Sequence, residues 1–176
     1  MRKKIIFIDI DGPLAWGTWM DGRVKINEHT SDEFTIPYPW VKEDCDALSK
    51  ICEETNAKLV LSSDWRKHYT LKQMSDIFIE YGIYAPLIDI TTHQSLWMKM
   101  SRPSLDWERA AQIVKWAKDY KISNWIAIDD LYLADQFKFM SPKIPMWRHI
   151  QVDGDSGVVG SKLRDKIDEC IKKLNR

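Results

Sequence analysis

The sequence predicts an α/β protein with a doubly wound, Rossmann-like and mostly parallel sheet between two layers of helices. Short apolar runs rich in β-branched residues alternate along the chain with segments of helical periodicity, as expected for strands joined by crossover helices. Several of these runs end directly in Asp or Ser, at the edge where such sheets bind ligands. The 176 residues, 44% of them hydrophobic, suffice for one core, so we expect a single domain over residues 1–176.

The first strand is predicted over residues 5–10, where a run of Ile and Phe is bounded by charged residues. The stretch of about 13–39 differs, because glycines and prolines separate two short strand-like segments at 24–26 and 34–36. This punctuation predicts a β-hairpin flap after the first strand. A helix over about 40–55 follows, with apolar residues at helical spacing.

The remaining elements follow from the same two periodicities. We expect a strand over 58–61, a helix over about 70–81 ended by Gly82, a strand over 87–90, a helix over 105–120, strands over 125–128 and 149–152, and a closing helix with Leu163, Ile167, Ile171 and Leu174 in register. None of the connections is long enough for a large cap domain, so the binding crevice should be relatively open.

Composition restricts the partners and the compartment. Charge is balanced, with 26 basic and 26 acidic residues, so the chain has no overall field to hold a membrane or a long nucleic acid, and an anionic ligand must be bound locally. Cys45, Cys52 and Cys170 are odd in number and lack metal-type spacing. No apolar run is long enough for a signal peptide or a membrane span. We expect a cytoplasmic protein with reduced thiols and no obligate protein partner.

Two carboxylates at the end of the first strand are the first sign of chemistry. Asp9 and Asp11 follow the apolar run and precede Gly12. Unpaired buried carboxylates are costly, and a metal ion or a hydrogen-bonded partner is the usual remedy. Two residues apart at a strand end, both can address one cation. An isolated Asp-x-Asp-Gly is equally typical of a solvated acidic turn, so the interpretation depends on the other strand ends.

Two further strands also end in polar residues. Ser62 and Ser63 follow the strand over 58–61, and Asp129 and Asp130 follow the strand over 125–128. Hard oxygen ligands from carboxylates and one phosphate oxygen suit Mg²⁺, so we expect Mg²⁺ as cofactor and a phosphorylated substrate. Local roles remain open, since serines can cap a turn and the aspartates can begin a short helix at Leu131.

The motifs resemble those of the haloacid dehalogenase (HAD) superfamily of phosphohydrolases over nearly the whole chain. Phe7-Ile8-Asp9-Ile10-Asp11-Gly12 resembles the first motif, Leu59-Val60-Leu61-Ser62 the second, and Ile126-Ala127-Ile128-Asp129-Asp130 the fourth. More narrowly, Leu61-Ser62-Ser63-Asp64-Trp65-Arg66 and the tail from His149 to Gly157 look like a small capless branch that includes phosphatase domains attached to RNA-repair proteins.

The resemblance implies a role for each matched residue. Asp9 would be the nucleophile that forms an aspartyl-phosphate, and Asp11 the general acid and base. Ser62 would hydrogen-bond a phosphate oxygen. Magnesium would be bound by Asp9, by Asp11 through its backbone carbonyl, and by one or both of Asp129 and Asp130.

Three other residues are candidates for binding the substrate. Ser63 replaces Ser62 if the register of the second motif is off by one, and Gly12 lies next to the first motif. Arg66 would reach a phosphate if Ser62 is in the site, although a surface arginine near a helix start is the commoner case.

The third motif is the least defined. In the family a Lys or Arg near the start of the helix before the fourth-motif strand offsets the charge of aspartate and phosphate. Arg109 fits best, with Lys99, Arg102 and Lys115 as alternatives. The competing interpretation of Arg109 is an ordinary solvated helix residue.

The sequence therefore predicts a magnesium-dependent phosphatase of phosphate monoesters. A nucleotide or a nucleic-acid terminal phosphate is the favoured substrate, because the site is open and Trp16, Trp19 and Tyr38 could stack on a base. Alternatives are a phosphoprotein or small-metabolite phosphatase, a phosphate-accepting receiver-like module, and a catalytically silent binding module.

Overall fold

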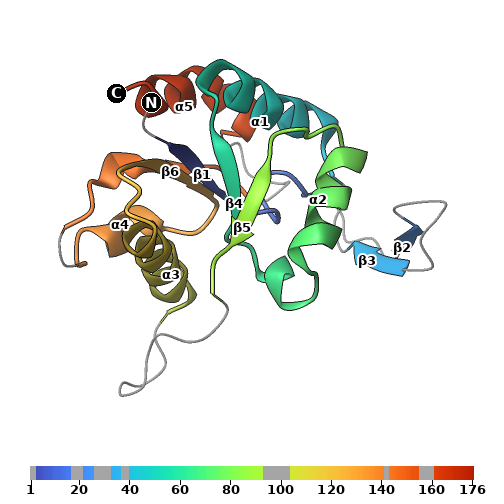
Figure 1. Ribbon diagram of the computed structural model, residues 1–176, viewed down its shortest axis with the longest axis horizontal. Coiled ribbons are helices and arrows are strands. Elements are labelled where there is room, and N and C mark those ends of the chain that lie inside the picture. Colours follow the sequence, from blue (N-terminus) through green and yellow to red (C-terminus); the bar gives the residue numbers. More distant parts are fainter. Residues whose placement is uncertain are drawn as a thin grey trace.

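The computed structural model describes residues 3–16, 22–25, 33–36, 40–92, 104–140, 143–154 and 161–176. A five-stranded, wholly parallel sheet has the strand order β5-β4-β1-β6-β7, which confirms the predicted α/β class (Figure 1). Its strands are β1 (Lys4–Ile8), β4 (Lys58–Leu61), β5 (Leu87–Ile90), β6 (Asn124–Asp129) and β7 (His149–Gln151).

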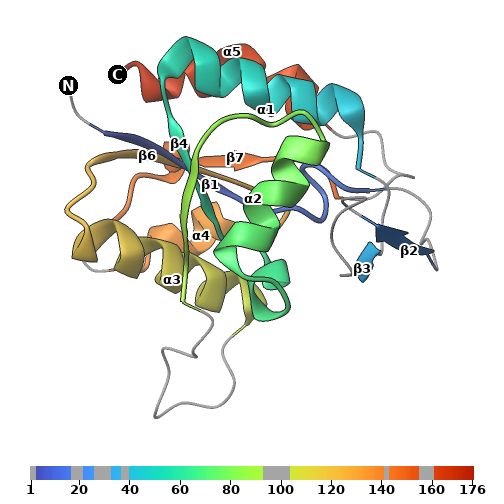
Figure 2. The same ribbon diagram turned by 45° about the vertical axis from the view of Figure 1, so that its right-hand side comes forward.

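Helices cover both faces of this sheet (Figures 1 and 2). Successive residues of a strand point to opposite faces, so Ile6 and Ile8 of β1 face one helical layer while Ile5 and Phe7 face the other. The first layer contains α1 (Lys42–Thr55), α2 (Leu71–Glu80) and α5 (Ile167–Leu174), and the second contains α3 (Leu105–Asp119) and α4 (Leu133–Phe137). Short 3-10 helices lie at η1 (Asp64–Lys67), η2 (Met146–Arg148) and η3 (Leu163–Lys166).

Local signals explain where the helices begin and end. α2 starts with a capping box, in which the Gln73 backbone N–H donates to Thr70 Oγ1 at 3.3 Å and the Thr70 N–H donates to Gln73 Oε1 at 2.9 Å. Gly82 follows α2 with a φ of 79°, a left-handed conformation that suits glycine. Ser104 caps α3 by accepting from the Trp107 N–H at 3.3 Å.

The predicted boundaries differ from the observed ones mainly where the chain leaves the sheet. Strands over 58–61 and 87–90 are found as predicted, but the first strand ends at Ile8 instead of Ile10. Beyond Asp9, whose N–H still donates to Ile128 O at 3.0 Å, the chain enters a tight turn closed by the Gly12 N–H and Ala15 O at 2.9 Å. The first turn of the predicted closing helix is the 3-10 helix η3.

The predicted flap is described only in part. β2 (Gly22–Lys25) and β3 (Glu33–Ile36) pair antiparallel, with Val24 opposite Phe34. The residues that join these strands to one another and to the rest of the chain lie largely outside the described part, so a role as a flap stays a prediction. None of the described helices is long and apolar enough to cross a bilayer.

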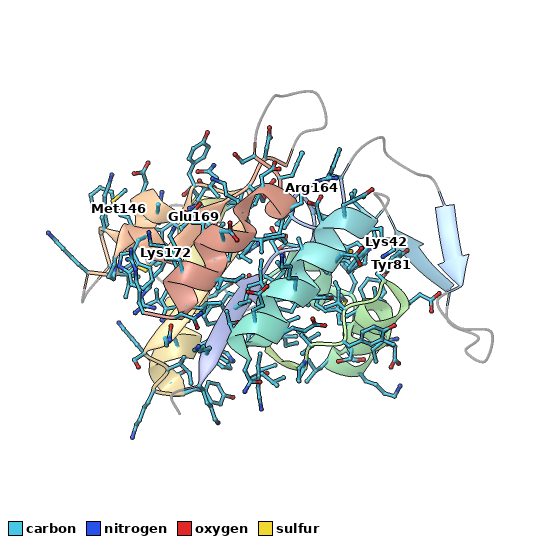
Figure 3. The ribbon with its side chains drawn as sticks, turned by 90° about the horizontal axis from the view of Figure 1, so that it is seen from above. Lys42, Tyr81, Met146, Arg164, Glu169 and Lys172 are labelled. Atoms are coloured by element: carbon cyan, nitrogen blue, oxygen red, sulfur yellow. The ribbon has the colours of Figure 1, made fainter. Side chains whose placement is uncertain are left out.

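One polar joint ties the first-motif loop to the α1 and α5 layer, which Figure 3 views from above. Asp44, in the first turn of α1, is fully buried and accepts from the Trp16 indole N–H at 2.9 Å. Arg164 of η3 reaches the same carboxylate, with Nε 3.2 Å from Asp44 Oδ1. In this structure the Trp16 side chain is therefore held by its hydrogen bond to Asp44. This contact differs from the base stacking that the sequence suggested for Trp16.

Candidate active site

The strand order brings the predicted motifs to one place. From β1 the chain moves outward through β4 to β5 and then crosses back to β6 on the other side of β1, so the order reverses at β1. Ligands of such sheets bind at the carboxyl ends of the strands beside this reversal. Asp9 follows β1, Ser62 follows β4 and Asp129 ends β6, which places the three at adjacent strand ends.

Asp9 lies buried between an arginine and the backbone. Its Oδ2 accepts from Arg109 Nη1 at 2.7 Å and its Oδ1 accepts from the Ile10 N–H at 2.8 Å. The same Nη1 is 3.0 Å from Asp129 Oδ2, so one guanidinium bridges the carboxylates of β1 and β6. Burial disfavours the charged form of Arg109, but Asp9 and Asp129 outweigh it and raise the pKa of the guanidinium.

Three carboxylates can share one cation. Among the described residues, Asp9, Asp129 and Asp130 each offer an oxygen, and these oxygens lie within 4.8 Å of one another. Burial, followed by the charge of Asp9, raises the pKa of Asp130 to about 6 and holds the pKa of Asp129 well above its usual value. A divalent cation would relieve this repulsion, and the all-oxygen donor set fits Mg²⁺. Asp129 Oδ1 also accepts from the Leu131 N–H at 3.0 Å, so the local capping role coexists with the cluster.

The Asp130 side chain fits in its position because two neighbouring residues, Gly12 and Gly154, have no side chain. A Cβ on Gly12 would lie 2.9 Å from Asp130 Cβ, and a Cβ on Gly154 would overlap Asp130 Oδ2. Gly12 also has a φ of 95°, which other residues rarely adopt. Its N–H is bonded to Ala15 O, so its visible role is to let the first-motif loop approach Asp130. Gly154 follows β7 and was not predicted, because nothing local in the sequence marks its contact with Asp130.

Asp11 stands apart from the three clustered carboxylates. Its Oδ1 and Oδ2 accept from the Trp65 indole N–H at 3.1 and 3.0 Å. Burial and the charge of Asp9 raise the pKa of Asp11 to about 6, although the Trp65 hydrogen bond works in the opposite direction. A carboxyl with this pKa can give up and take a proton near neutral pH, which suits an acid and base. Sequence reasoning missed Trp65, whose indole meets Asp11 only in the folded chain.

The two serines after β4 have different surroundings. Ser62 is buried and its Oγ has no hydrogen-bond partner among the described residues. A buried hydroxyl without a partner is costly, so a ligand oxygen at this position would satisfy it. Ser63 Oγ accepts from the Trp65 N–H at 3.5 Å, which is the turn-capping role. The geometry therefore favours Ser62 over Ser63 as the hydroxyl that could bind a ligand oxygen.

Arg66 is buried, contrary to the surface position that its place near a helix start suggests. Its Nη1 donates to Ser62 O and Ser63 O at 2.6 and 2.5 Å, and its Nη2 donates to Gln112 Oε1 at 2.6 Å. These hydrogen bonds hold the backbone of the turn after β4 in place and connect it to Gln112 of α3. Burial, followed by the charge of Arg109, lowers the pKa of Arg66 to about 10.

Arg109 is the basic residue that meets the site in the described structure. It projects from α3 to Asp9 and Asp129 and is 3% exposed, so it is not the solvated helix residue of the competing interpretation. Lys115, one alternative, pairs on the surface with Asp119 at 2.7 Å. Lys99 and Arg102 lie outside the described residues, as do Trp19 and Tyr38.

Comparison with known proteins agrees with this geometry. The family model described as the HAD domain in Swiss Army Knife RNA repair proteins matches residues 5–161. That range contains each of the site residues described above. Neither the curated proteins nor the solved structures gave a match.

Proposed function

This chain belongs to the family of HAD domains in Swiss Army Knife RNA repair proteins, and we propose that it hydrolyses the terminal phosphate of a nucleic acid or nucleotide with the help of Mg²⁺. The observation that carries the proposal is the buried Asp9 carboxylate. Asp9 pairs with Arg109 and forms an oxygen cluster with Asp129 and Asp130. It follows β1, and the adjacent strand β4 is followed by Ser62, whose hydroxyl has no partner among the described residues.

The residues can divide the reaction into two steps. In the first, a carboxylate oxygen of Asp9 attacks phosphorus, the bond from phosphorus to the leaving oxygen breaks, and Asp11 gives that oxygen a proton. In the second, Asp11 takes a proton from a water that attacks the aspartyl-phosphate, and phosphate leaves with Asp9 regenerated. Bound Mg²⁺ would neutralise charge on the phosphoryl oxygens.

Other groups position the phosphate. The Ser62 hydroxyl can donate to one phosphoryl oxygen, because it has no acceptor within the described residues. Arg109 supplies positive charge on the side of Asp9.

Two features support the substrate class. The family description names RNA repair proteins. No separate cap domain lies between β4 and α3 in the described residues, which leaves room for a bulky strand end. A small sugar phosphate gains more from an enclosed site.

A phosphate-release assay tests the proposal. The wild type should release phosphate from p-nitrophenyl phosphate with Mg²⁺ and lose that activity in EDTA, and Asp9→Asn should abolish turnover while its circular dichroism stays unchanged. Asp89→Asn is the matched control, because Asp89 is a carboxylate of the edge strand β5 that accepts from the Trp116 indole N–H and lies outside the cluster. Substantial activity in Asp9→Asn would refute the nucleophile role.

A substrate panel then decides the finer assignment. Oligonucleotides with 5′ or 3′ terminal phosphates, mononucleotides, sugar phosphates and phosphopeptides are compared by kcat/KM. We expect the oligonucleotides or mononucleotides to exceed the other classes by at least about tenfold, which corresponds to about 1.4 kcal/mol in the transition state. A clear preference for phosphopeptides or sugar phosphates would overturn the nucleic-acid assignment and leave the phosphatase assignment intact.

A further inference from the structure

Trp65 makes the most specific contact in the site that the proposed mechanism does not use. Its indole N–H points between the two oxygens of Asp11, at 3.1 and 3.0 Å, across 54 residues of sequence. The side chain is 5% exposed. An indole N–H can only donate a hydrogen bond, so this contact fixes the carboxylate as the acceptor.

The indole itself is held on several sides. Its ring lies edge-on to Trp40 with centroids 5.8 Å apart and contacts Tyr69 at 5.5 Å. Its backbone N–H caps onto Ser63 Oγ, and Arg66 fixes the carbonyls of the same turn. The turn after β4 therefore carries both the unpartnered Ser62 hydroxyl and a rigid donor directed at Asp11.

We propose that Trp65 is the positioning residue for Asp11, holding its carboxylate beside the Asp9, Asp129 and Asp130 cluster so that it can exchange protons with the leaving oxygen and the attacking water. This inference rests on the proposed phosphatase function. Trp65 touches no reacting atom, and it acts only through Asp11.

The physical reason is competition for the carboxylate. Asp11 is two residues from Asp9, and a free aspartate side chain can rotate about χ1 toward a bound cation, which attracts it strongly. A carboxylate that binds the cation directly cannot serve as an acid or a base. The Trp65 N–H offers Asp11 an alternative partner, and the packing against Trp40 and Tyr69 keeps that partner in place.

The test compares Trp65→Phe with Trp40→Phe. Both residues are buried in one aromatic cluster, and both changes remove the same atoms. Trp40 Nε1 has no hydrogen-bond partner among the described residues, so its replacement changes packing without removing a hydrogen bond. If Trp65→Phe does not fold, β-(3-benzothienyl)alanine at position 65 removes the N–H and keeps the shape of the ring.

The substrates separate proton transfer from binding. With an alkyl phosphate or a phosphorylated oligonucleotide, whose leaving oxygen needs a proton, Trp65→Phe should lower kcat by about 30-fold to 100-fold, up to the lower limit of what a general acid usually contributes, with KM unchanged within about twofold. With p-nitrophenyl phosphate the first step needs little acid, so a burst of nitrophenolate should precede slow turnover, because water activation still depends on Asp11. Trp40→Phe keeps an aromatic ring beside Trp65 and leaves the Trp65 N–H intact, so it should change each constant by less than about threefold.

Each outcome decides the matter. Equal kinetics of the two variants, or a rise in KM with kcat unchanged, would overturn the positioning role of Trp65. The absence of phosphate release by the wild type would refute the proposed function itself, which is a different result from an active wild type with an equally active Trp65→Phe.

Discussion

The two edges of the parallel sheet have opposite character. At the carboxyl edge, the buried Arg109 donates to the buried carboxylates of Asp9 and Asp129 at 2.7 and 3.0 Å. At the amino edge, Lys58 and its neighbours line an open depression of about 420 Å³ without any carboxylate side chain among the lining residues, which are Lys3, Lys4, Thr55, Asn56, Lys58, Asn124, Leu174, Asn175 and Arg176. Charges are confined and desolvated at one edge and screened by water at the other.

This difference indicates where the fold gives up stability for chemistry. Buried like charges raise the free energy of the folded state, whereas solvated lysines cost little because water and salt screen them. Natural proteins tolerate such unfavourable groups mainly at functional sites. Substitutions at the carboxyl edge should therefore change both stability and activity, and substitutions at the amino edge should change neither.

The largest effect is expected for Arg109→Ala. It removes the cation shared by Asp9 and Asp129 and leaves two buried carboxylates facing each other. The free energy of unfolding in EDTA at neutral pH should fall by about 3 kcal/mol, as for other broken buried ion pairs. Turnover should fall by about 10²-fold to 10³-fold. Urea unfolding and phosphate release measure the two effects.

Arg109→Lys is the matched control, because it keeps the charge and loses the geometry of the guanidinium. Its unfolding free energy and its turnover should lie between those of the wild type and those of Arg109→Ala. Added Mg²⁺ should recover part of the stability of Arg109→Ala, since it also neutralises the carboxylates. An unchanged unfolding free energy in Arg109→Ala would show that the carboxyl edge is not strained as described.

The next effect concerns metal affinity. In Gly154→Ala the new Cβ would overlap Asp130 Oδ2, so the carboxylate must rotate away from its cluster. Because altered support of a metal ligand typically costs 10-fold to 100-fold in affinity, we expect Mg²⁺ binding to weaken by about 10-fold or more in calorimetric titration.

Gly82→Ala separates this effect from general loss of stability. Gly82 has a φ of 79° and no atom near the site of a Cβ, so its replacement strains the backbone alone. It should lower the unfolding free energy by about 1 kcal/mol and leave Mg²⁺ binding unchanged. Equal Mg²⁺ affinities of wild type and Gly154→Ala would contradict the role of Gly154.

A smaller effect should appear in the pH dependence of stability. The pKa of Asp130 is raised from 3.8 to about 6 in the folded protein, first by burial and then by Asp9. A raised carboxyl pKa stabilises the fold below about pH 4, and this contribution is lost as the pH rises through about 6. In EDTA, Asp130→Asn should therefore match the wild type at pH 4 and exceed its stability at pH 7 by on the order of 1 kcal/mol, after allowance for solvent screening.

Urea unfolding between pH 4 and pH 8 measures this difference. With Mg²⁺ at pH 7 the order should reverse, because the wild type alone retains the full set of ligands. A stability difference that stays constant between pH 4 and pH 8 would mean that Asp130 does not experience the repulsion inferred from its position.

The smallest effect is expected at the amino edge. Lys58 is exposed at the start of β4, and Lys58→Ala removes one of the solvated cations around the depression. The free energy of unfolding should change by no more than about 0.5 kcal/mol, and kcat/KM should remain as in the wild type. A marked loss of stability or of kcat/KM in Lys58→Ala would contradict the difference between the two edges of the sheet.

Much of the fold and part of the site follow from the sequence. The strands over 58–61 and 87–90 could be located because parallel strands form short apolar runs, even in the partly exposed edge strand β5, and Asp9, Ser62 and Asp129 follow such runs directly. The reversal of strand order that brings them together was expected from the alternation of strands and helices. Arg109 could be selected because the resemblance to the HAD superfamily implies a basic residue early in this helix, but its contact with Asp129 could not be predicted.

The remaining contacts depend on packing between distant segments. Trp65 is one of nine tryptophans, and nothing in the sequence distinguishes it from those that fill the core. Only the conformation of the turn after β4 directs its N–H toward Asp11. Arg66 looks like a surface residue because the buried carbonyls that bind it belong to the peptide backbone, which carries no mark in the sequence. Gly154 escapes notice for the same reason, since a missing side chain matters only when a neighbour fills its space.

The central place of β1 also bears on biosynthesis. Its register partners begin at Lys58 on one side and Asn124 on the other, so β1 is synthesised well before either strand that pairs with it. Contacts this distant in sequence form slowly, and a nascent chain that has not yet reached β6 keeps one side of β1 unpaired. Emerging chains should therefore depend on chaperones until β6 leaves the ribosome, and truncation before β6 should yield aggregation in place of a smaller folded unit.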